Sequence, residues 1–169
     1  MEGKSLSREL ARETMERITL GNAAPEQVGA LLAALRIKGE TAEEILGFLD
    51  CLKAQAVPLP IERDDLIDVC GTGGDGSGTF NISTAVALVV AALGVPVAKH
   101  GNRALSSKSG SAEVLHQLGV NIDRETDVLE RCLAGAGITF LMAPKHHTAM
   151  RHVGPVRVEL GTRTIFNLL

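Results

Sequence analysis

A glycine-rich loop between two apolar segments constrains the fold of this chain more than any other feature. Residues 71–79 read GTGGDGSGT and contain five glycines. The loop follows the short apolar segment 66–70 and precedes residues 83–93, which are almost wholly apolar. Because glycine reaches positive φ at little cost, such a loop can curl until several N–H groups face one anion. The order of strand, glycine loop and helix predicts an anion site at a helix N-terminus.

Composition narrows the class of protein. The chain has 169 residues, of which 45% are hydrophobic and 22% charged, so it can form a sizeable core. A net charge of −3 argues against a general nucleic-acid binder, and four Phe without Trp or Tyr supply few stacking platforms. No run approaches the length of a membrane span, and residues 2–5 are charged or polar without an apolar h-region, so we expect neither secretion nor membrane insertion. Cys51, Cys70 and Cys132 are too far apart to suggest a metal site, so we expect reduced core thiols in a cytoplasmic protein.

The first sixty residues have the pattern of a helical domain. Apolar residues at helical spacing predict a helix over 6–20 and a second one that begins at Pro25. Thr41 and Glu44 form a capping-box pattern before a third helix. The sequence VPLP at 57–60 then predicts a linker, because each proline disfavours helix in the residue before it. Residues 1–60 are therefore predicted to form an N-terminal helical domain.

The pattern changes after residue 60 to an alternation of strands and helices. We predict strands at 66–70, 95–99 and 138–142 and helices at 83–93, 111–118 and 126–134. This alternation predicts an α/β fold with a mostly parallel sheet and crossover helices, in which residues 61–149 form the start of an α/β domain. Residues 150–169 look helical, and we expect them to join the N-terminal helices.

The apolar ending TIFNLL and the small number of strands suggest that the chain is an N-terminal piece of a longer protein.

Several interpretations of the glycine loop have to be weighed. Gly71, Gly73 and Gly76 match the dinucleotide fingerprint, which needs an acidic residue at the end of the second strand. Lys99 and His100 stand there instead, and a cation suits a phosphate better than a ribose diol. The Walker pattern fails because no Gly-Lys-Ser/Thr follows. A glycine turn without a ligand remains an alternative, although five glycines cost more chain entropy than a turn requires.

A second loop concentrates positive charge after the second predicted strand. Residues 99–103 read KHGNR, and Lys108 follows within a serine-rich segment. We expect Ser111 to cap the next helix. Cations and hydroxyls near two helix starts favour a polyphosphate pocket at the carboxyl edge of the sheet. The alternative is a solvated basic loop.

Several motifs in order carry a family resemblance. They are GTGGD at 71–75, NIST at 81–84, KHGNR at 99–103, SSKSGSAEVL at 106–115, MAP at 142–144, PVR at 155–157 and RTIFN at 163–167. Together they closely resemble anthranilate phosphoribosyltransferase over essentially the whole chain. The nucleoside phosphorylases share the architecture, and the resemblance therefore implies a nucleoside phosphorylase/phosphoribosyltransferase type of fold.

The resemblance implies an early step of tryptophan biosynthesis. The amine of anthranilate attacks C1 of phosphoribosyl pyrophosphate (PRPP), and pyrophosphate leaves. The positions implied to bind PRPP are Gly71, Gly73, Gly74, Asp75, Thr79, Asn81, Ser83, Thr84, Lys99, Lys108 and Ser111. Ser83 is implied to lie beside a Mg²⁺ ion. The positions implied to bind anthranilate are Gly71, His100, Asn102, His147 and Arg157.

The resemblance also implies how the reaction is catalysed and how the chain assembles. No protein nucleophile is needed, so catalysis consists of positioning and electrostatic stabilisation. His100 could act as a general base, but we interpret it first as a binding residue. A cytoplasmic homodimer through the N-terminal helices is implied, with neither nucleic acid nor membrane as a partner.

Two departures from the family leave alternatives open. Thr148 follows His147 where family members commonly have proline, and the family's Asp-Glu pair for a second magnesium has no counterpart before Leu169. The chain could therefore be a catalytically incomplete binding or dimerisation fragment. A nucleoside phosphorylase-like enzyme is the other alternative.

Overall fold

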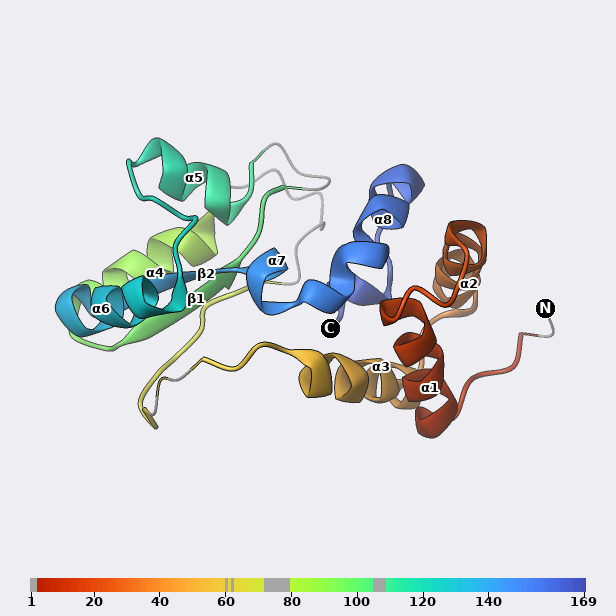
Figure 1. Ribbon diagram of the computed structural model, residues 1–169. Helices are drawn as coiled ribbons and strands as arrows, with labels where there is room; N and C mark the ends of the chain where they lie inside the picture. The colour runs from red at the N-terminus through yellow and green to blue at the C-terminus, as the bar shows by residue number, and fades with distance from the viewer. Residues whose placement is uncertain (1–2, 60, 62, 72–79, 105–108) are drawn as a thin grey trace. The chain divides into compact units, whose positions relative to one another are not determined.

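The structure of the chain is a computed structural model, shown in Figure 1. It describes residues 3–59, 61, 63–71, 80–104 and 109–169. The chain divides into two compact units. The helical unit consists of Met1–Val57 together with His147–Leu169, and the α/β unit consists of Pro58–His146.

The helical unit has three longer helices from the first part of the chain and three short ones from the end. They are α1 (Arg8–Thr19), α2 (Pro25–Lys38), α3 (Ala42–Gln55), η1 (Thr148–His152), α8 (Gly154–Leu160) and η2 (Ile165–Asn167). Local signals set where the first helices begin. Ser7 caps α1 by accepting from the N–H of Leu10, and Pro25 occupies the first turn of α2. The capping box of Thr41 and Glu44 at the start of α3 is confirmed.

One apolar core joins the two stretches of chain in the helical unit. Its buried members are Ala11, Met15, Ile18, Val28, Leu32, Leu35, Phe48, Cys51, Val153, Val156 and Ile165. Residues from α1, α2 and α3 therefore share a core with residues from η1 to η2. The end of the chain is an integral part of this core.

Gly47 allows α1 and α3 to pack closely. A Cβ at this position would lie 2.7 Å from the Cβ of Ala11 and would overlap the backbone carbonyl of Arg8. Ala11 is completely buried, and the obstacle is backbone, so neither neighbour can move aside cheaply. Gly29 in α2 has no such constraint, since its nearest neighbour would be 3.6 Å away.

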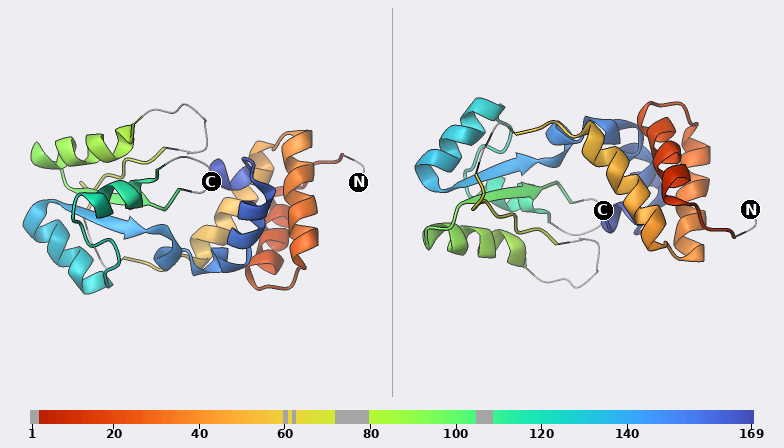
Figure 2. Two further views of the ribbon diagram at one scale, coloured as in Figure 1. Left: turned by 90° about the horizontal axis from the view of Figure 1, so that it is seen from above. Right: turned by 90° about the horizontal axis from the view of Figure 1, so that it is seen from below.

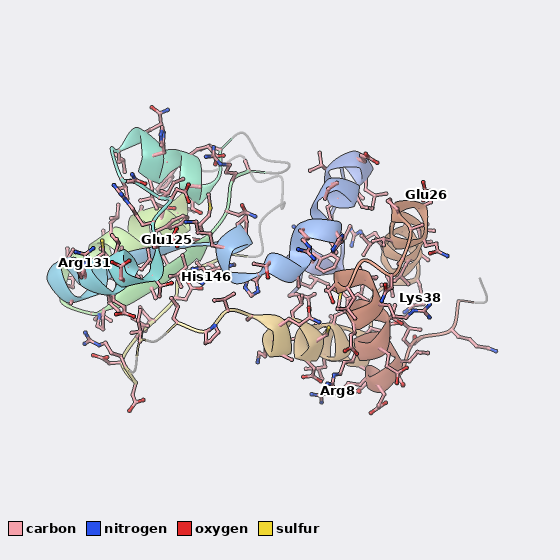
Figure 3. All side chains as sticks on the ribbon, in the orientation of Figure 1. Arg8, Glu26, Lys38, Glu125, Arg131 and His146 are labelled. Atoms are coloured by element: carbon pink, nitrogen blue, oxygen red, sulfur yellow. The ribbon has the colours of Figure 1, made fainter. Side chains whose placement is uncertain are left out.

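Glu44 is a fully buried carboxylate that holds the start of α3 to two other segments. It accepts hydrogen bonds from the N–H of Leu6 (2.9 Å) and the N–H of Thr41 (2.8 Å). The ammonium of Lys38, which is labelled in Figure 3, donates to it at 2.9 Å. Burial raises the pKa of Glu44, but these hydrogen bonds outweigh burial and leave the pKa below its usual value. The carboxylate is thus charged and satisfied in the core.

The α/β unit is built on two parallel strands. The strands are β1 (Val97–Gly101) and β2 (Ile138–Met142), paired in register from Val97 with Ile138 to Gly101 with Met142. The helices are α4 (Ile82–Ala92), α5 (Ser111–Gln117), α6 (Thr126–Ala136) and α7 (Ala143–His146).

The helices of this unit cover the two faces of the strands. Leu115 of α5 packs with Phe140, whereas Leu129 of α6 packs with Ala98 and Leu141. Since successive strand residues point to opposite faces, α5 and α6 lie on different faces. Figure 2 shows α4 and α6 on opposite sides of the two strands. The predicted α/β class with a parallel sheet is confirmed.

The prediction of a strand over 66–70 was wrong in its extent. Only Ile67 pairs with the sheet, through a single parallel bridge to Val97. Beyond it, the N–H of His100 donates to the side chain of Asp68. The carbonyl of Val69, which would have accepted that N–H, instead accepts from the ammonium of Lys99. After one bridge, hydrogen bonds from side chains to the backbone therefore replace the backbone hydrogen bonds of a parallel ladder.

The expectation that all three cysteines are core thiols was wrong for two of them. Cys51 is buried in the helical core, whereas Cys70 and Cys132 are exposed. Cys70 follows the point where the sheet pairing stops, and Cys132 lies on the polar side of the amphipathic helix α6.

Apolar side chains also remain on the surface of α4. Its outward residues Ile82, Val86, Val89 and Leu93 (the last at the C-cap) are exposed. Within the described ranges, no helix is both long and apolar enough to cross a membrane.

Substituting the two helix glycines tests the close approach of α1 and α3. We expect Gly29→Ala to stabilise the protein by up to about 1 kcal/mol, because alanine is the better helix former and has room. Gly47→Ala should destabilise it by about 2 kcal/mol through overpacking. The check is urea unfolding followed by far-UV circular dichroism. Equal stabilisation by both substitutions would contradict the close packing at Gly47.

The lowered pKa of Glu44 predicts an acid-sensitive contribution to stability. A folded-state pKa below the unfolded value of about 4.5 stabilises the protein above that pH, and the contribution is lost as the pH falls through the folded-state pKa. We expect Glu44→Gln to lose about 2 kcal/mol at pH 7 and progressively less at lower pH. The exposed Glu43→Gln is the matched control. If the urea midpoints of the two variants depended on pH in the same way, this role of Glu44 would be wrong.

Candidate functional site

Two loop-bearing segments leave the same edge of the sheet in the α/β unit. The N–H of Ala98 donates to the carbonyl of Ile67 at 2.9 Å, and the N–H of Ile67 donates to the carbonyl of Pro96 at 3.1 Å. These bonds align the segment before Gly71 with β1, whose end carries His100 and Gly101. Because the two run parallel, their carboxyl ends meet at one edge, where ligands of open α/β sheets bind.

Lys99, Asp68 and His100 form the contact between these two ends. Lys99 is only 3% exposed, and its Nζ donates to the carbonyl of Val69 at 2.6 Å. Burial lowers the pKa of Lys99, and the carboxylate of Asp68 opposes that effect. The N–H of His100 donates to Oδ1 of Asp68 at 3.0 Å.

The first turn of α4 brings three of the predicted site residues together. Asn81 is the N-cap, and its Nδ2 donates to the carbonyl of Ser109 at 3.4 Å. A Cβ on Gly71 would lie 3.8 Å from Oγ of Ser83, so the start of the glycine loop approaches this turn. Thr84 is almost fully buried, and its hydroxyl has no hydrogen-bond partner among the described residues. The turn therefore presents a helix N-terminus and a half-buried hydroxyl beside the glycine segment.

The second loop is attached to the start of α5. The carbonyl of Asn102 accepts from the N–H of Ala112 (3.3 Å) and from Oγ of Ser111 (3.4 Å). A Cβ on Gly101 would overlap Oγ of Ser111 and lie 2.6 Å from Cε2 of Phe140, so this position has to be glycine.

The expected capping role of Ser111 was wrong. The N-cap of α5 is Gly110, and the carboxylate of Glu113 accepts from the N–H of Gly110 at 2.8 Å and from the N–H of Ala104 at 3.2 Å. Glu113 and Asp68 are two residues that sequence reasoning missed. The spacing of Gly110 and Glu113 was a capping signal, and a carboxylate inside an apolar segment was the signal at Asp68.

The other predicted residues fall into two groups. Five predicted PRPP positions, Gly73, Gly74, Asp75, Thr79 and Lys108, lie outside the described residues. Two predicted anthranilate positions, His147 and Arg157, belong to the helical unit, whereas Gly71, His100 and Asn102 belong to the α/β unit.

Arg157 has a defined environment within the helical unit. Its guanidinium carbon lies 5.3 Å from the centre of the Phe166 ring, and that ring lies 6.4 Å from the ring of Phe48. Burial lowers the pKa of Arg157. Among the residues with described positions, no carboxylate pairs with it. Arg157 is thus a partly desolvated cation, held on an aromatic face and able to accept an acidic ligand.

Metal ligands are sparse in the part of the chain that the structure describes. It contains no group of three His, Cys, Asp or Glu side chains that could hold a metal ion. Any divalent cation at the first turn of α4 would therefore need oxygen atoms from its ligand in addition to a hydroxyl such as that of Ser83.

Comparisons with known proteins match both units. The helical bundle domain of the glycosyl transferase family matches residues 1–56, and the a/b domain of that family matches residues 63–169. Anthranilate phosphoribosyltransferase of Rhizobium meliloti (strain 1021) is 60% identical over 167 residues, which are 98% of this chain and 49% of the relative. The chain therefore spans about half the length of the curated relatives that it matches.

Solved structures of the same enzyme are similar as well. The enzyme from Thermus thermophilus is 46% identical with a TM-score of 0.88 over 98% of this chain and 50% of that one. The enzyme from Saccharomyces cerevisiae in complex with PRPP and Mg is 28% identical with a TM-score of 0.85, over 97% of this chain and 49% of that one. A further yeast structure in complex with 4-fluoroanthranilate is 28% identical with a TM-score of 0.76, over 97% and 47% of the two chains.

The helical bundle domain and the a/b domain together match most of the chain, in that order. They agree with the helices and the parallel sheet of the structure. The chain belongs to the glycosyl transferase family.

Proposed function

We propose that this protein is an anthranilate phosphoribosyltransferase of the cytoplasm, which transfers the phosphoribosyl group of PRPP to the amine of anthranilate in tryptophan biosynthesis. The names of the similar proteins support this, although the chain spans only about half their length. The observation that carries the proposal is the convergence at one sheet edge of Gly71, the first turn of α4 and the Lys99–Asn102 loop.

PRPP is proposed to bind at this edge. Gly71, Gly73 and Gly74 would offer N–H groups, and Asp75 and Thr79 complete that loop. Asn81, Ser83 and Thr84 surround the positive end of α4, where an anion is favoured. Lys99, Lys108 and Ser111 would supply charge and a hydroxyl from the second loop and α5. A diphosphate suits the site because its charge is spread over several oxygens that N–H groups can reach.

Mg²⁺ is proposed to accompany PRPP. The half-buried hydroxyl of Ser83 is a hard oxygen donor, and diphosphate oxygens would complete the coordination. When bound, the ion would neutralise charge on the departing pyrophosphate. The protein groups hold that diphosphate in place through the first turn of α4 and the loop N–H groups.

Anthranilate is proposed to bind through its carboxylate to Arg157. The ring of Phe166 supports one face of the guanidinium and leaves its N–H edge for a planar acid. Gly71, His100, Asn102 and His147 are the remaining proposed contacts. His100 is proposed as a binding residue, because an aromatic amine loses its proton readily after attack and positioning supplies most of the rate.

A homodimer through the N-terminal helices is proposed on the strength of the resemblance. Leu10, Leu20 and Ile37 are exposed on or beside α1 and α2, which is consistent with an interface there.

Binding of PRPP tests the site at the sheet edge. We expect calorimetric titration with PRPP in the presence of MgCl₂ to show saturable binding that weakens when Mg²⁺ is removed. Ser83→Ala should lower the affinity roughly tenfold, since it removes a ligand to a charged group. Thr126→Ala, at the first turn of α6, is the matched control and should bind normally.

The same samples separate the alternatives. No binding of PRPP by the unaltered protein would refute the proposed site. Binding without loss of anthranilate in an activity assay would identify a binding fragment, and phosphate-dependent release of a free base from a nucleoside would identify a nucleoside phosphorylase.

Substitution of Arg157 tests the anthranilate contact. We expect Arg157→Ala to weaken anthranilate binding at least tenfold, measured by the fluorescence of anthranilate, because it removes a bidentate charged partner. Arg157→Lys should recover part of the affinity, since it restores the charge without the fork. The exposed Arg151→Ala serves as the control. If Arg157→Ala weakened the binding of PRPP more than the binding of anthranilate, the proposed assignment of Arg157 to anthranilate would be wrong.

A further inference from the structure

We propose that Asp68 is a positioning residue that fastens the segment ending at Gly71 to the end of β1, so that Gly71 and Asn102 are held at the same edge of the proposed PRPP site. This inference rests on the proposed function, because it assigns a task within the same site. Asp68 was not among the residues expected to bind substrate. Its position between the two segments, rather than contact with a ligand, is the basis of the proposal.

The strand pairing between the Ile67 segment and β1 ends in an unusual way. After the bridge between Ile67 and Val97, a regular parallel ladder would join the N–H of His100 to the carbonyl of Val69. That N–H donates to Oδ1 of Asp68 at 3.0 Å instead. The carboxylate therefore takes the place of a ladder carbonyl and links this segment directly to the backbone of β1.

Lys99 makes a reciprocal contact from β1 to the backbone of the other segment. Its Nζ donates at 2.6 Å to the Val69 carbonyl that the ladder has released. Lys99 is 3% exposed, and a buried ammonium is costly unless a negative charge lies near. Burial lowers the pKa of Lys99, and the negative charge of the exposed Asp68 opposes that effect. Each segment thus sends one side chain to the backbone of the other.

This pair of contacts lies next to residues of the proposed site. Gly71 lies two residues after Val69, and a Cβ there would be 3.8 Å from Oγ of Ser83 at the first turn of α4. Asn102 lies two residues after His100, and its carbonyl holds the start of α5. The pair of contacts therefore fixes Gly71 and Asn102 relative to each other at the edge of the proposed site. Without it, part of the binding free energy of PRPP would be spent on bringing these two positions together, and affinity would fall.

The test compares Asp68→Asn and Asp68→Ala with Asp65→Asn, an exposed carboxylate in the same segment that pairs with Arg63. Asp68→Asn keeps an acceptor oxygen but loses the charge beside Lys99, so we expect PRPP affinity in MgCl₂ to fall about threefold to tenfold. Asp68→Ala loses both and should bind more weakly still. Pyrophosphate is a smaller ligand that can be held by one loop, so its affinity should fall less than that of PRPP.

Far-UV circular dichroism and the urea midpoint identify variants that no longer fold, and Asp68→Asn decides the question if Asp68→Ala is among them. A PRPP affinity of Asp68→Asn equal to that of Asp65→Asn overturns the inference. So does an equal loss for pyrophosphate and PRPP, because that would be a general weakening of the unit. If the unaltered protein binds no PRPP, the proposed function itself fails, and this outcome is distinct from the other two.

Discussion

The alignment of Ile67 with Val97 is the contact on which the candidate site depends. It is one parallel bridge, yet it sets the direction in which two chain segments leave the sheet. In each case the next described helix begins at this edge of the unit, α4 after the first segment and α5 after the second. At the end of β1, Gly101 lets the chain pass close to Ser111 and Phe140, because a Cβ there would overlap Oγ of Ser111 and lie 2.6 Å from Cε2 of Phe140. The alignment of the backbone thus brings the two segments of the candidate site to one edge, and side-chain contacts then fix their positions.

Local signals in the sequence were sufficient for most of the elements. The strand at 138–142 was predicted with its observed limits. Its residues include β-branched and aromatic side chains, which favour strands, and Gly137 ends the preceding helix with a positive φ. The strand at 95–99 was predicted two residues early. Val95 and Pro96 are apolar, but proline has no N–H to donate, and the regular pairing begins at Val97. Helix starts were predicted well where a capping side chain or a proline stood next to an apolar pattern, as at Thr41 and Pro25.

Side-chain competition for backbone groups explains what the sequence could not predict. Nothing in the spacing of residues 66–70 indicates that Asp68 and Lys99 would end the strand pairing, because these contacts join residues about thirty positions apart. The cap of α5 was missed for a related reason. Ser111 has a good capping side chain, but its hydroxyl donates to the carbonyl of Asn102, and the carboxylate of Glu113 accepts from the N–H of the N-cap residue Gly110. In both places a carboxylate holds backbone N–H groups of the second loop, which a one-dimensional pattern does not reveal.

The two cations that the resemblance assigns to substrates have opposite environments. Arg157 rests on the ring of Phe166 without a described acidic partner, so its N–H edge is available to a carboxylate. Lys99 already donates to Val69 and is balanced by Asp68, so a direct bond to phosphate would compete with the contact that orders the glycine segment. The Lys99 ammonium can remain bonded to Val69 and still favour a nearby anion, because the electrostatic attraction between charges acts over a longer distance than a hydrogen bond. In the proposed PRPP site, N–H groups and the first turn of α4 would therefore provide the directional contacts to the diphosphate, while Lys99 would contribute charge and order.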